Sequence, residues 1–215
     1  MVARSLAIHP IWILAALALL AASLASPAAG QTPTVPVDEP SFETHGSLPW
    51  EEPPGATPFV VEEVVDGDTI RVIEDADRNG PDPWWELVRI IGIDTPETES
   101  PYTEEECYGE EASEFLSELL PQGTTVYLQV DNDPDIPDDR EITDEGMELD
   151  DYDRWLAHAY LRDGEDYYLL SEVIVLGGYA EVPGYEGNTY FVKELDEAEE
   201  IAREENRGMW GACDA

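Results

Sequence analysis

A charged side chain stands inside an apolar run of the sequence, directly before a cluster of acidic and small polar residues. Arg89 lies within Leu87–Ile93, and Asp94-Thr95-Pro96-Glu97 follows at once. A cation among apolar neighbours requires a charged partner or a ligand. Two carboxylates three residues apart, around a turn stiffened by proline, offer hard oxygen ligands, which suit Ca²⁺ better than Zn²⁺. Asp68, in an earlier turn, is a further candidate ligand.

An arginine beside a carboxylate-bound cation is an arrangement suited to phosphate chemistry. Both positive charges neutralise the negative charge that grows at phosphorus when a nucleophile attacks. The alternative is a surface turn with an incidental ion pair, which is common for any single acidic residue. The unit as a whole, with arginine, strand and two acids in this order, favours the phosphate interpretation.

Short β-branched and amphipathic segments must position these side chains. The patterns predict strands at 59–65, 69–73, 84–93, 124–130 and 154–161, and helices at 108–120, 168–176 and 189–206. Most of the strands come before the helices, which indicates an α+β fold, a small closed barrel with helices packed on it.

Four segments, in order, resemble the staphylococcal nuclease (thermonuclease) family. They are Val65-Asp66-Gly67-Asp68-Thr69-Ile70, Arg89-Ile90-Ile91-Gly92-Ile93-Asp94-Thr95-Pro96-Glu97-Thr98, Tyr108-Gly109-Glu110-Glu111-Ala112 and Asp151-Tyr152-Asp153-Arg154. The closing Asn206-Arg207-Gly208-Met209-Trp210 resembles the family's C-terminal end. The resemblance covers roughly residues 58–211. It implies a five-stranded OB-fold barrel with three packed α-helices.

The resemblance also implies a role for each matching site residue. Ca²⁺ would be bound by the carboxylates of Asp68 and Asp94 and by the backbone carbonyl of Thr95. Glu97 would act as the general base for the attacking water. Arg89 and Arg154 would bind the phosphate with a planar bidentate geometry that lysine lacks. The implied reaction is endonucleolytic hydrolysis of DNA or RNA to 5′-hydroxyl and 3′-phosphate ends.

The sequence departs from the family pattern around the second arginine. Asp153 stands where the family usually has glycine, and Asp151 stands at a place where the family's type member has lysine. Aspartate tolerates turn conformations, so the backbone is expected to survive the change. Tyr152 matches a tyrosine near the bound nucleotide, and Tyr185 is a second candidate for substrate contact.

Two acidic stretches are separate candidates for calcium binding. The spacing of Asp75, Asp77, Asn79 and Glu86 fits an EF-hand loop, but strands rather than helices are expected on both sides. The alternative is a hairpin with an Asn-Gly turn. Residues 131–153 contain twelve acids and one arginine, Arg140, which is typical of a solvated insertion between strands.

The N-terminal residues differ in chemistry from the rest. Residues 1–30 contain Arg4, an apolar run at 11–24 and small residues at 25–30, the pattern of a signal peptide cleaved near Ala29-Gly30. The alternative is a membrane anchor, but the run is short for a span of about 20 residues. Residues 31–57, rich in Pro, Thr and Glu, are expected to be a flexible linker before a domain at 58–215. These features predict a secreted or extracytoplasmic protein.

The net charge of the chain is strongly negative. The 215 residues contain 10 basic and 50 acidic residues, giving a formal charge of −40. Removal of residues 1–30 takes away Arg4 and no acid, which leaves −41. This balance argues against a broad basic surface for nucleic acid or anionic membranes. Adaptation to high salt and neutralisation by bound Ca²⁺ are the two explanations, and the even spread of acids favours the first.

Cys107 and Cys213 are the only cysteines, and an even pair in an exported protein predicts a disulfide. The alternative is two unpaired buried thiols. Taken together, the sequence predicts a secreted, Ca²⁺-dependent endonuclease, expected to be a monomer with nucleic acid as its only partner. The rival hypotheses are a non-catalytic OB-fold module that binds nucleic acid and an acidic calcium-binding surface protein.

Overall fold

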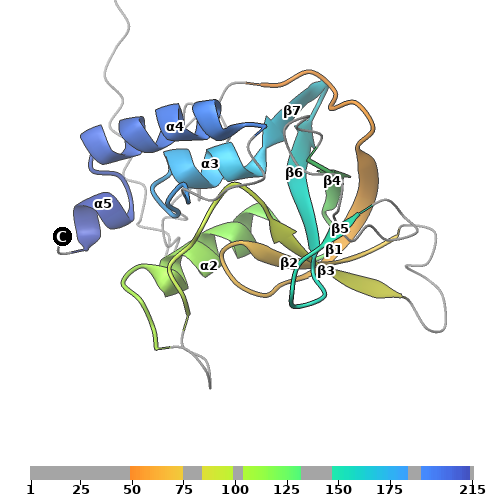
Figure 1. Ribbon diagram of the computed structural model, residues 1–215, viewed down its shortest axis with the longest axis horizontal. Helices are drawn as coiled ribbons and strands as arrows, with labels where there is room; N and C mark the ends of the chain where they lie inside the picture. The colour runs from red at the N-terminus through yellow and green to blue at the C-terminus, as the bar shows by residue number, and fades with distance from the viewer. Residues whose placement is uncertain (1–48, 75–83, 99–103, 132–146, 184–189, 214–215) are drawn as a thin grey trace, which may run out of the picture. The chain divides into compact units, whose positions relative to one another are not determined.

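A computed structural model describes residues 49–74, 84–98, 104–131, 147–183 and 190–213 (Figure 1). Its strands are β1 (Thr57–Val64), β2 (Thr69–Ile73), β3 (Trp85–Ile90), β4 (Thr125–Gln129), β5 (Glu148–Leu149), β6 (Trp155–Asp163) and β7 (Asp166–Leu169). Its helices are α2 (Gly109–Leu119), α3 (Leu170–Leu176), α4 (Val192–Glu204) and the short α5 (Met209–Ala212). No helix among the described residues is long and apolar enough to cross a membrane.

Five strands close into a barrel. Antiparallel pairings join them in the order β3-β2-β1-β4-β6, and a parallel pairing of β3 with β6 completes the ring. The short strands β5 and β7 extend β6 at the sides. Helices α2, α3 and α4 pack outside the barrel (Figure 1). The α+β class and the five-stranded OB-fold barrel with three helices are therefore confirmed.

Alternation along the strands builds the core. Inward residues are fully buried, among them Ile70 and Val72 on β2 and Val88 and Ile90 on β3. Helix α2 adds Leu116 to the same cluster. Residues between the inward positions, such as Arg89, point the other way because side chains alternate across a strand. The core thus fixes which face of β3 carries the arginine.

The register of three strands gathers the site residues at one place. Thr69 of β2 pairs with Arg89 of β3, and Arg89 pairs with Leu156 of β6. Arg154 stands two residues before Leu156, immediately ahead of β6. Segments that are about 20 and 65 residues apart in the chain therefore meet at one edge of the barrel.

Several elements differ from the sequence prediction. The helix predicted at 189–206 is α4, Val192–Glu204, and the short β5, β7 and α5 were not predicted. The helix predicted at 168–176 begins only at Leu170, because Tyr167 and Tyr168 pair with β6 as part of strand β7. The strand predicted at 84–93 ends at Ile90, since the chain turns at Gly92 with φ 85°. A continuous apolar run hides both boundaries. Burial alone does not distinguish strand from helix at 168–170, and the buried Ile91 and Ile93 continue the apolar run past the end of β3.

The segment just before the barrel is attached to it. Trp50 and Tyr167 exchange backbone hydrogen bonds of 2.7 and 3.3 Å, and Trp50 Nε1 donates to Glu172 at 2.9 Å. The Trp50 ring packs edge-on against Phe191 with centroids 5.0 Å apart. The described end of the segment predicted as a linker is therefore held against β7, α3 and the start of α4.

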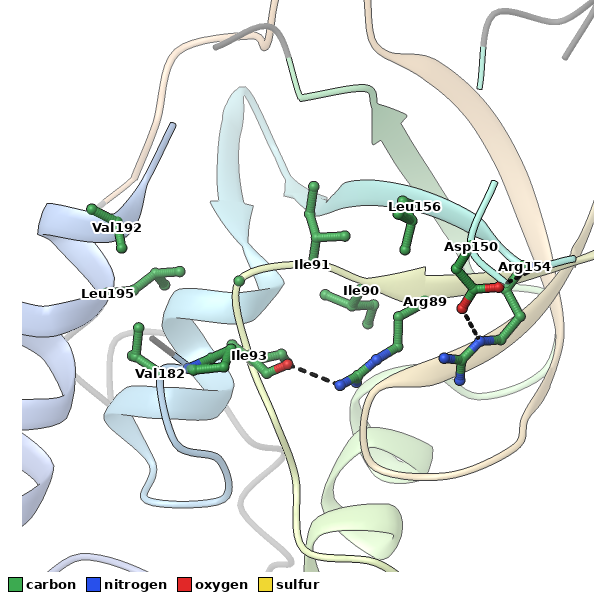
Figure 2. A pocket seen from close by; sticks show the side chains of 12 residues that line it. Arg89, Ile90, Ile91, Ile93, Asp150, Arg154, Leu156, Val182, Val192 and Leu195 are labelled. Atoms are coloured by element: carbon green, nitrogen blue, oxygen red, sulfur yellow. Dashed lines mark hydrogen bonds and ion pairs between the residues drawn. The ribbon is translucent and has the colours of Figure 1, made fainter. Parts of the chain in front are cut away.

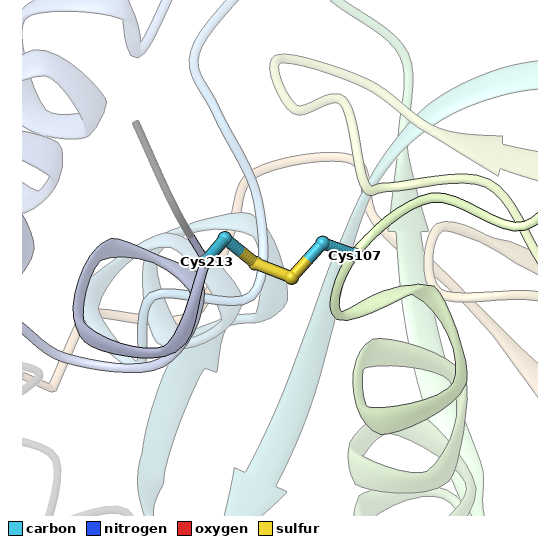
Figure 3. Close-up of a disulfide and its surroundings, with 2 residues drawn as sticks. All are labelled: Cys107 and Cys213. Atoms are coloured by element: carbon cyan, nitrogen blue, oxygen red, sulfur yellow. A yellow bond between two sulfur atoms is a disulfide. The ribbon is translucent and has the colours of Figure 1, made fainter.

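A disulfide joins the chain just before α2 to the chain just after α5. Cys107 and Cys213 are 106 residues apart in sequence, and their Cα atoms are 6.0 Å apart (Figure 3). The pairing is the one that the sequence predicts. It ties the C-terminus to the residues that lead into the first described helix.

Reduction of this disulfide is expected to lower the melting temperature. Closing so long a loop stabilises a fold by about 2–4 kcal/mol, chiefly by restricting the unfolded chain. In a chain of this size each kcal/mol corresponds to about 2–4 °C. We expect a fall of roughly 5–15 °C in a thermal melt with dithiothreitol. The double variant Cys107→Ser/Cys213→Ser should melt at the reduced temperature and ignore the reductant. Two free thiols in unreduced protein, found by mass spectrometry, would refute the bond.

Candidate active site

Arg89 lies at the centre of a ring of oxygen atoms. Its guanidinium is ion-paired with Asp68 through Nη1 and with Asp94 through Nη2, the latter at 3.0 Å. Nη2 also donates to the backbone carbonyl of Ile93 at 3.1 Å (Figure 2). The arginine side chain is only 16% exposed. Charge-assisted hydrogen bonds to two carboxylates offset the cost of burying this cation.

Asp68 is the most enclosed carboxylate of the site, with 6% of the residue exposed. It accepts hydrogen bonds from the hydroxyl of Thr69 at 3.1 Å and from the hydroxyl of Thr95 at 3.0 Å. The Thr95 amide donates to it at 3.3 Å. Gly67 makes this approach possible, because a Cβ there would lie 2.8 Å from the Thr95 hydroxyl. The turn after β1 and the segment after β3 are thus joined through one carboxylate.

Asp94 has a different environment from Asp68. Its backbone forms a pair of hydrogen bonds with Glu181, of 2.9 and 2.8 Å, which fix the segment that follows β3. Its side chain remains 50% exposed. One carboxylate oxygen is engaged by Arg89 and the rest of the group faces solvent, so Asp94 is accessible to a ligand.

Arg154 is held in place by Asp150. The Asp150 carboxylate accepts from Nε of Arg154 at 2.8 Å and from its amide at 2.9 Å (Figure 2). It also accepts from the Tyr152 amide at 2.8 Å. Nη1 of Arg154 donates to Thr69 at 3.2 Å, which connects it to Asp68. Asp153 has φ 60°, the left-handed conformation in which glycine is most at ease. The backbone expected for the glycine-to-aspartate departure is therefore present.

The two arginines line one cavity of about 160 Å³ (Figure 2). Burial lowers the pKa of Arg89, Asp94 counteracts this, and the charge of Arg154 lowers it further. An arginine pKa starts so high that the side chain stays charged in proteins. A cavity with two fixed cations next to acidic ligands is suited to an anion with several oxygen atoms, such as a phosphate.

Two site residues were missed by the sequence analysis. Asp150 is one, and its spacing of four residues from Arg154 was the available signal. Asp66 is the other. Burial raises its pKa, and the nearby Arg89 and Arg154 counteract part of that rise. Its position two residues before Asp68 was the signal, since the Asp66 carboxylate accepts from the Asp68 amide at 3.1 Å.

Glu97 stands apart from this network. The residue is exposed, and among the described residues no hydrogen bond or ion pair connects its carboxylate to Arg89 or Asp68. Its backbone is paired instead with Glu106: the Glu97 amide donates to the Glu106 carboxylate at 3.1 Å, and the Glu106 amide donates to the Glu97 carbonyl at 2.9 Å. It lies two residues after Thr95, on the segment that carries the site.

The predicted substrate-contact tyrosines and the predicted second calcium loop are described only in part. Tyr152 is 79% exposed, and its ring centroid is 5.5 Å from the guanidinium carbon of Arg154. Glu86 accepts a hydrogen bond from the Trp84 indole, on the far part of β3 from Arg89. Tyr185 and three members of the predicted EF-hand-like loop, Asp75, Asp77 and Asn79, lie outside the described residues.

The donor set fits a hard cation. Asp68, Asp94 and the Thr95 carbonyl supply oxygen only, which suits Ca²⁺ or Mg²⁺. Within the described ranges no three acidic, histidine or cysteine side chains are close enough to form a complete metal site. An ion here would therefore be completed by water or by substrate oxygens. It would also share the two carboxylates with Arg89.

Comparison with known proteins gives a consistent result. Residues 87–212 match the family described as Staphylococcal nuclease homologue. The chain is 30% identical over 152 residues to "Thermonuclease" of Staphylococcus intermedius, covering 71% of this chain and 75% of that protein. "Thermonuclease" of Staphylococcus hyicus matches to the same extent. "Endonuclease YncB" of Bacillus subtilis (strain 168) is 30% identical over 151 residues, 70% of this chain and 60% of that protein.

The matched region begins within β3 and contains Arg89, the acidic segment that follows it, Arg154 and the helices that pack on the barrel. The relatives named Thermonuclease match over 71% of this chain. This chain belongs to the staphylococcal nuclease family.

Proposed function

We propose that this protein is a Ca²⁺-dependent endonuclease that hydrolyses phosphodiester bonds in DNA, RNA or both, giving 5′-hydroxyl and 3′-phosphate ends. The observation that carries the proposal is Arg89, buried between Asp68 and Asp94 and sharing a cavity with Arg154. In a chain of net charge −40, two arginines that line the same cavity mark this place as one that can attract an anion. The nuclease names of the relatives agree with this chemistry.

The metal would be held by the carboxylates of Asp68 and Asp94 and by the Thr95 carbonyl, and when bound it supplies Lewis-acid polarisation of a phosphoryl oxygen. Thr69 and Thr95 orient the Asp68 carboxylate through their hydrogen bonds. Gly67 leaves the space that this arrangement requires. An ion would share the Asp68 oxygens with these hydrogen bonds and with Arg89.

The protein groups that act on substrate are two arginines and one glutamate. Glu97 takes the proton of the attacking water as general base. Arg89 and Arg154 bind the phosphate oxygens through their planar guanidinium groups, and Arg154 also stabilises the departing oxygen. Asp150 accepts from Nε of Arg154, and Nη1 donates to Thr69, so the guanidinium is held from two sides. Phosphate oxygens would replace part of the carboxylate contacts that Arg89 makes in the free protein.

The site of action follows from the sequence and the disulfide. We infer that residues 1–30 are a signal peptide cleaved near Ala29-Gly30, that residues 31–57 form a linker whose described end, at Trp50, is attached to the domain, and that residues 58–215 form the nuclease domain. Disulfides persist in oxidising compartments, so the Cys107–Cys213 bond supports a secreted or extracytoplasmic location. The protein would act there as a monomer on nucleic acid.

Plasmid digestion tests the proposed function. Purified protein should nick and degrade plasmid DNA with Ca²⁺ and stop when EGTA is added, and the products should carry 5′-hydroxyl ends that polynucleotide kinase can label. Protein that binds DNA without cutting it in Ca²⁺ would favour the non-catalytic OB-fold module instead. Cutting that continues in EGTA would contradict calcium dependence.

The substitutions Glu97→Gln, Arg89→Ala and Arg154→Ala should each lower kcat strongly. Loss of a general base alone costs about 100- to 10,000-fold. Glu97→Gln and Arg154→Ala should keep their far-ultraviolet circular dichroism and melting temperature, whereas Arg89→Ala, which leaves buried Asp68 uncompensated, should fold but melt at a lower temperature. Glu200→Gln, an exposed acid on α4, serves as the matched control with unchanged kcat. A folded Glu97→Gln protein with wild-type kcat would show that the mechanism is wrong.

Asp150→Asn should lower kcat by about tenfold, because it weakens the charged hydrogen bond that orients Arg154.

Burial opposes ionisation of Asp150, but hydrogen bonds from Arg154 and Tyr152 outweigh it and hold the Asp150 pKa below its ordinary value. Its stabilising contribution is therefore present above the unfolded pKa of about 4 and lost as pH falls through the lower folded pKa. The gap in unfolding free energy between wild type and variant should be constant from pH 5 to 8 and narrow below pH 4. Exposed Asp151→Asn is the control, and a gap that widens in acid would contradict the account.

Salt should first raise and then lower the activity. Phosphate contacts weaken with salt because they release counterions. A chain of charge −40 also repels both itself and a polyanion, and this repulsion is screened as the Debye length falls from ~10 Å at 0.1 M to ~3 Å at 1 M. We expect the melting temperature to rise with NaCl and the initial rate at saturating Ca²⁺ to peak well above physiological ionic strength. A steady fall of both from the lowest salt would leave neutralisation by Ca²⁺ as the explanation of the charge.

A further inference from the structure

The segment that carries Glu97 is attached to the start of α2 through its backbone. The Glu97 amide and carbonyl bond to the carboxylate and the amide of Glu106. Glu106 in turn accepts, through its own carbonyl, the Gly109 amide at 3.1 Å. The peptide of the proposed general base is therefore fixed by one residue, Glu106, while the Glu97 side chain remains exposed.

Close packing at Gly109 strengthens this attachment. A Cβ on Gly109 would lie 2.3 Å from the carbonyl oxygen of Glu97 and 2.8 Å from its carbonyl carbon. Tyr108, just before it, has φ 78°, an uncommon conformation for a residue with a side chain. The chain at 106–109 is thus shaped to lie directly against the Glu97 peptide.

Cys107 stands in the middle of this contact segment and is bonded to Cys213. Cys213 follows α5, and its amide donates to the Met209 carbonyl at 2.9 Å. The Met209 amide donates to Gly178 at 2.9 Å, and Arg207 Nη1 donates to the carbonyl of Leu176 at 2.9 Å, which anchors α5 on the end of α3. The disulfide therefore connects the Glu97 backbone, through Glu106 and Cys107, to the end of α5 and so to the end of α3.

We propose that Glu106 and the Cys107–Cys213 disulfide are positioning elements for Glu97, so that the nuclease reaches full kcat only when oxidised. This inference rests on the function proposed above. Cys107 is exposed, so a dithiol can reach the bond. One dithiol molecule is oxidised to its own disulfide and transfers two electrons and two protons to the Cys107–Cys213 bond. That bond breaks, and both cysteines become thiols. The two hydrogen bonds with Glu106, one of them to its carboxylate, then remain to link Glu97 to the start of α2.

Steady-state kinetics at 20 °C, below the melting temperature of every form, test the proposal. With a single-stranded oligonucleotide and saturating Ca²⁺, dithiothreitol should lower the wild-type kcat by about fivefold to tenfold and leave KM within twofold. The variant Cys107→Ser/Cys213→Ser should show the reduced kcat with and without dithiothreitol.

A double-mutant cycle with Glu97→Gln separates positioning from general stabilisation. If the disulfide acts through Glu97, reduction should lower kcat no further in the Glu97→Gln protein. An equal fold-loss on reduction in wild type and in Glu97→Gln would overturn the proposal, because it would show an effect of the disulfide on the fold as a whole. An unchanged wild-type kcat on reduction, with two thiols counted, would also overturn it.

Variants of Glu106 provide an independent readout. Glu106→Ala should lower kcat with little change in KM, whereas Glu106→Gln, which keeps an oxygen acceptor for the Glu97 amide, should restore most of it. Neighbouring Glu105→Ala, an exposed acid, is the matched control. Equal losses in Glu106→Gln and Glu106→Ala would contradict the hydrogen-bond role. Oxidised wild type that fails to cut in Ca²⁺ would overturn the proposed function, whereas cutting that ignores the redox state would overturn this inference alone.

Discussion

The structure of the site depends on one buried cation. Arg89 projects from a strand whose alternate residues fill the barrel core, and its charge is compensated by Asp68, Asp94 and a backbone carbonyl. Removing one partner of such a buried pair leaves the other charge uncompensated. This lowers the free energy of unfolding far more than the loss of a surface ion pair does. The close turn at Gly67, the two threonine contacts of Asp68 and the backbone pairing of Asp94 with Glu181 all hold these partners in place.

The same constraint connects ligand binding to catalysis. The carboxylates that neutralise Arg89 are the oxygen ligands proposed for Ca²⁺, so an ion and the guanidinium compete for them. Asp68, Asp94 and the Thr95 carbonyl would hold the ion, and Arg89 would bind phosphate oxygens in place of part of its carboxylate contacts. Metal and substrate would in this way support each other's binding within a chain whose overall charge repels nucleic acid.

The sequence predicted those features that depend on local patterns. Alternating β-branched runs gave the barrel strands, and the apolar run around Arg89 identified the buried cation. The presence of only two cysteines left one possible disulfide, and the structure contains it. The predicted start of α3, at residue 168, was wrong because the pairing of Tyr167 and Tyr168 with β6 is a tertiary effect. The role of Glu106 depends on hydrogen bonds with the backbone of Glu97, which side-chain types alone do not indicate.

Calorimetric titration of Ca²⁺ into wild type and Asp68→Asn, in 1 M NaCl to screen the acidic surface, tests the central claim most directly. Wild type should show one saturable site above weak diffuse binding. The variant should lose that site, while Asp151→Asn, a charge-matched change of an exposed residue, should keep it. Identical stoichiometry and affinity in wild type and Asp68→Asn would contradict the claim that the oxygens around Arg89 form the metal and phosphate site.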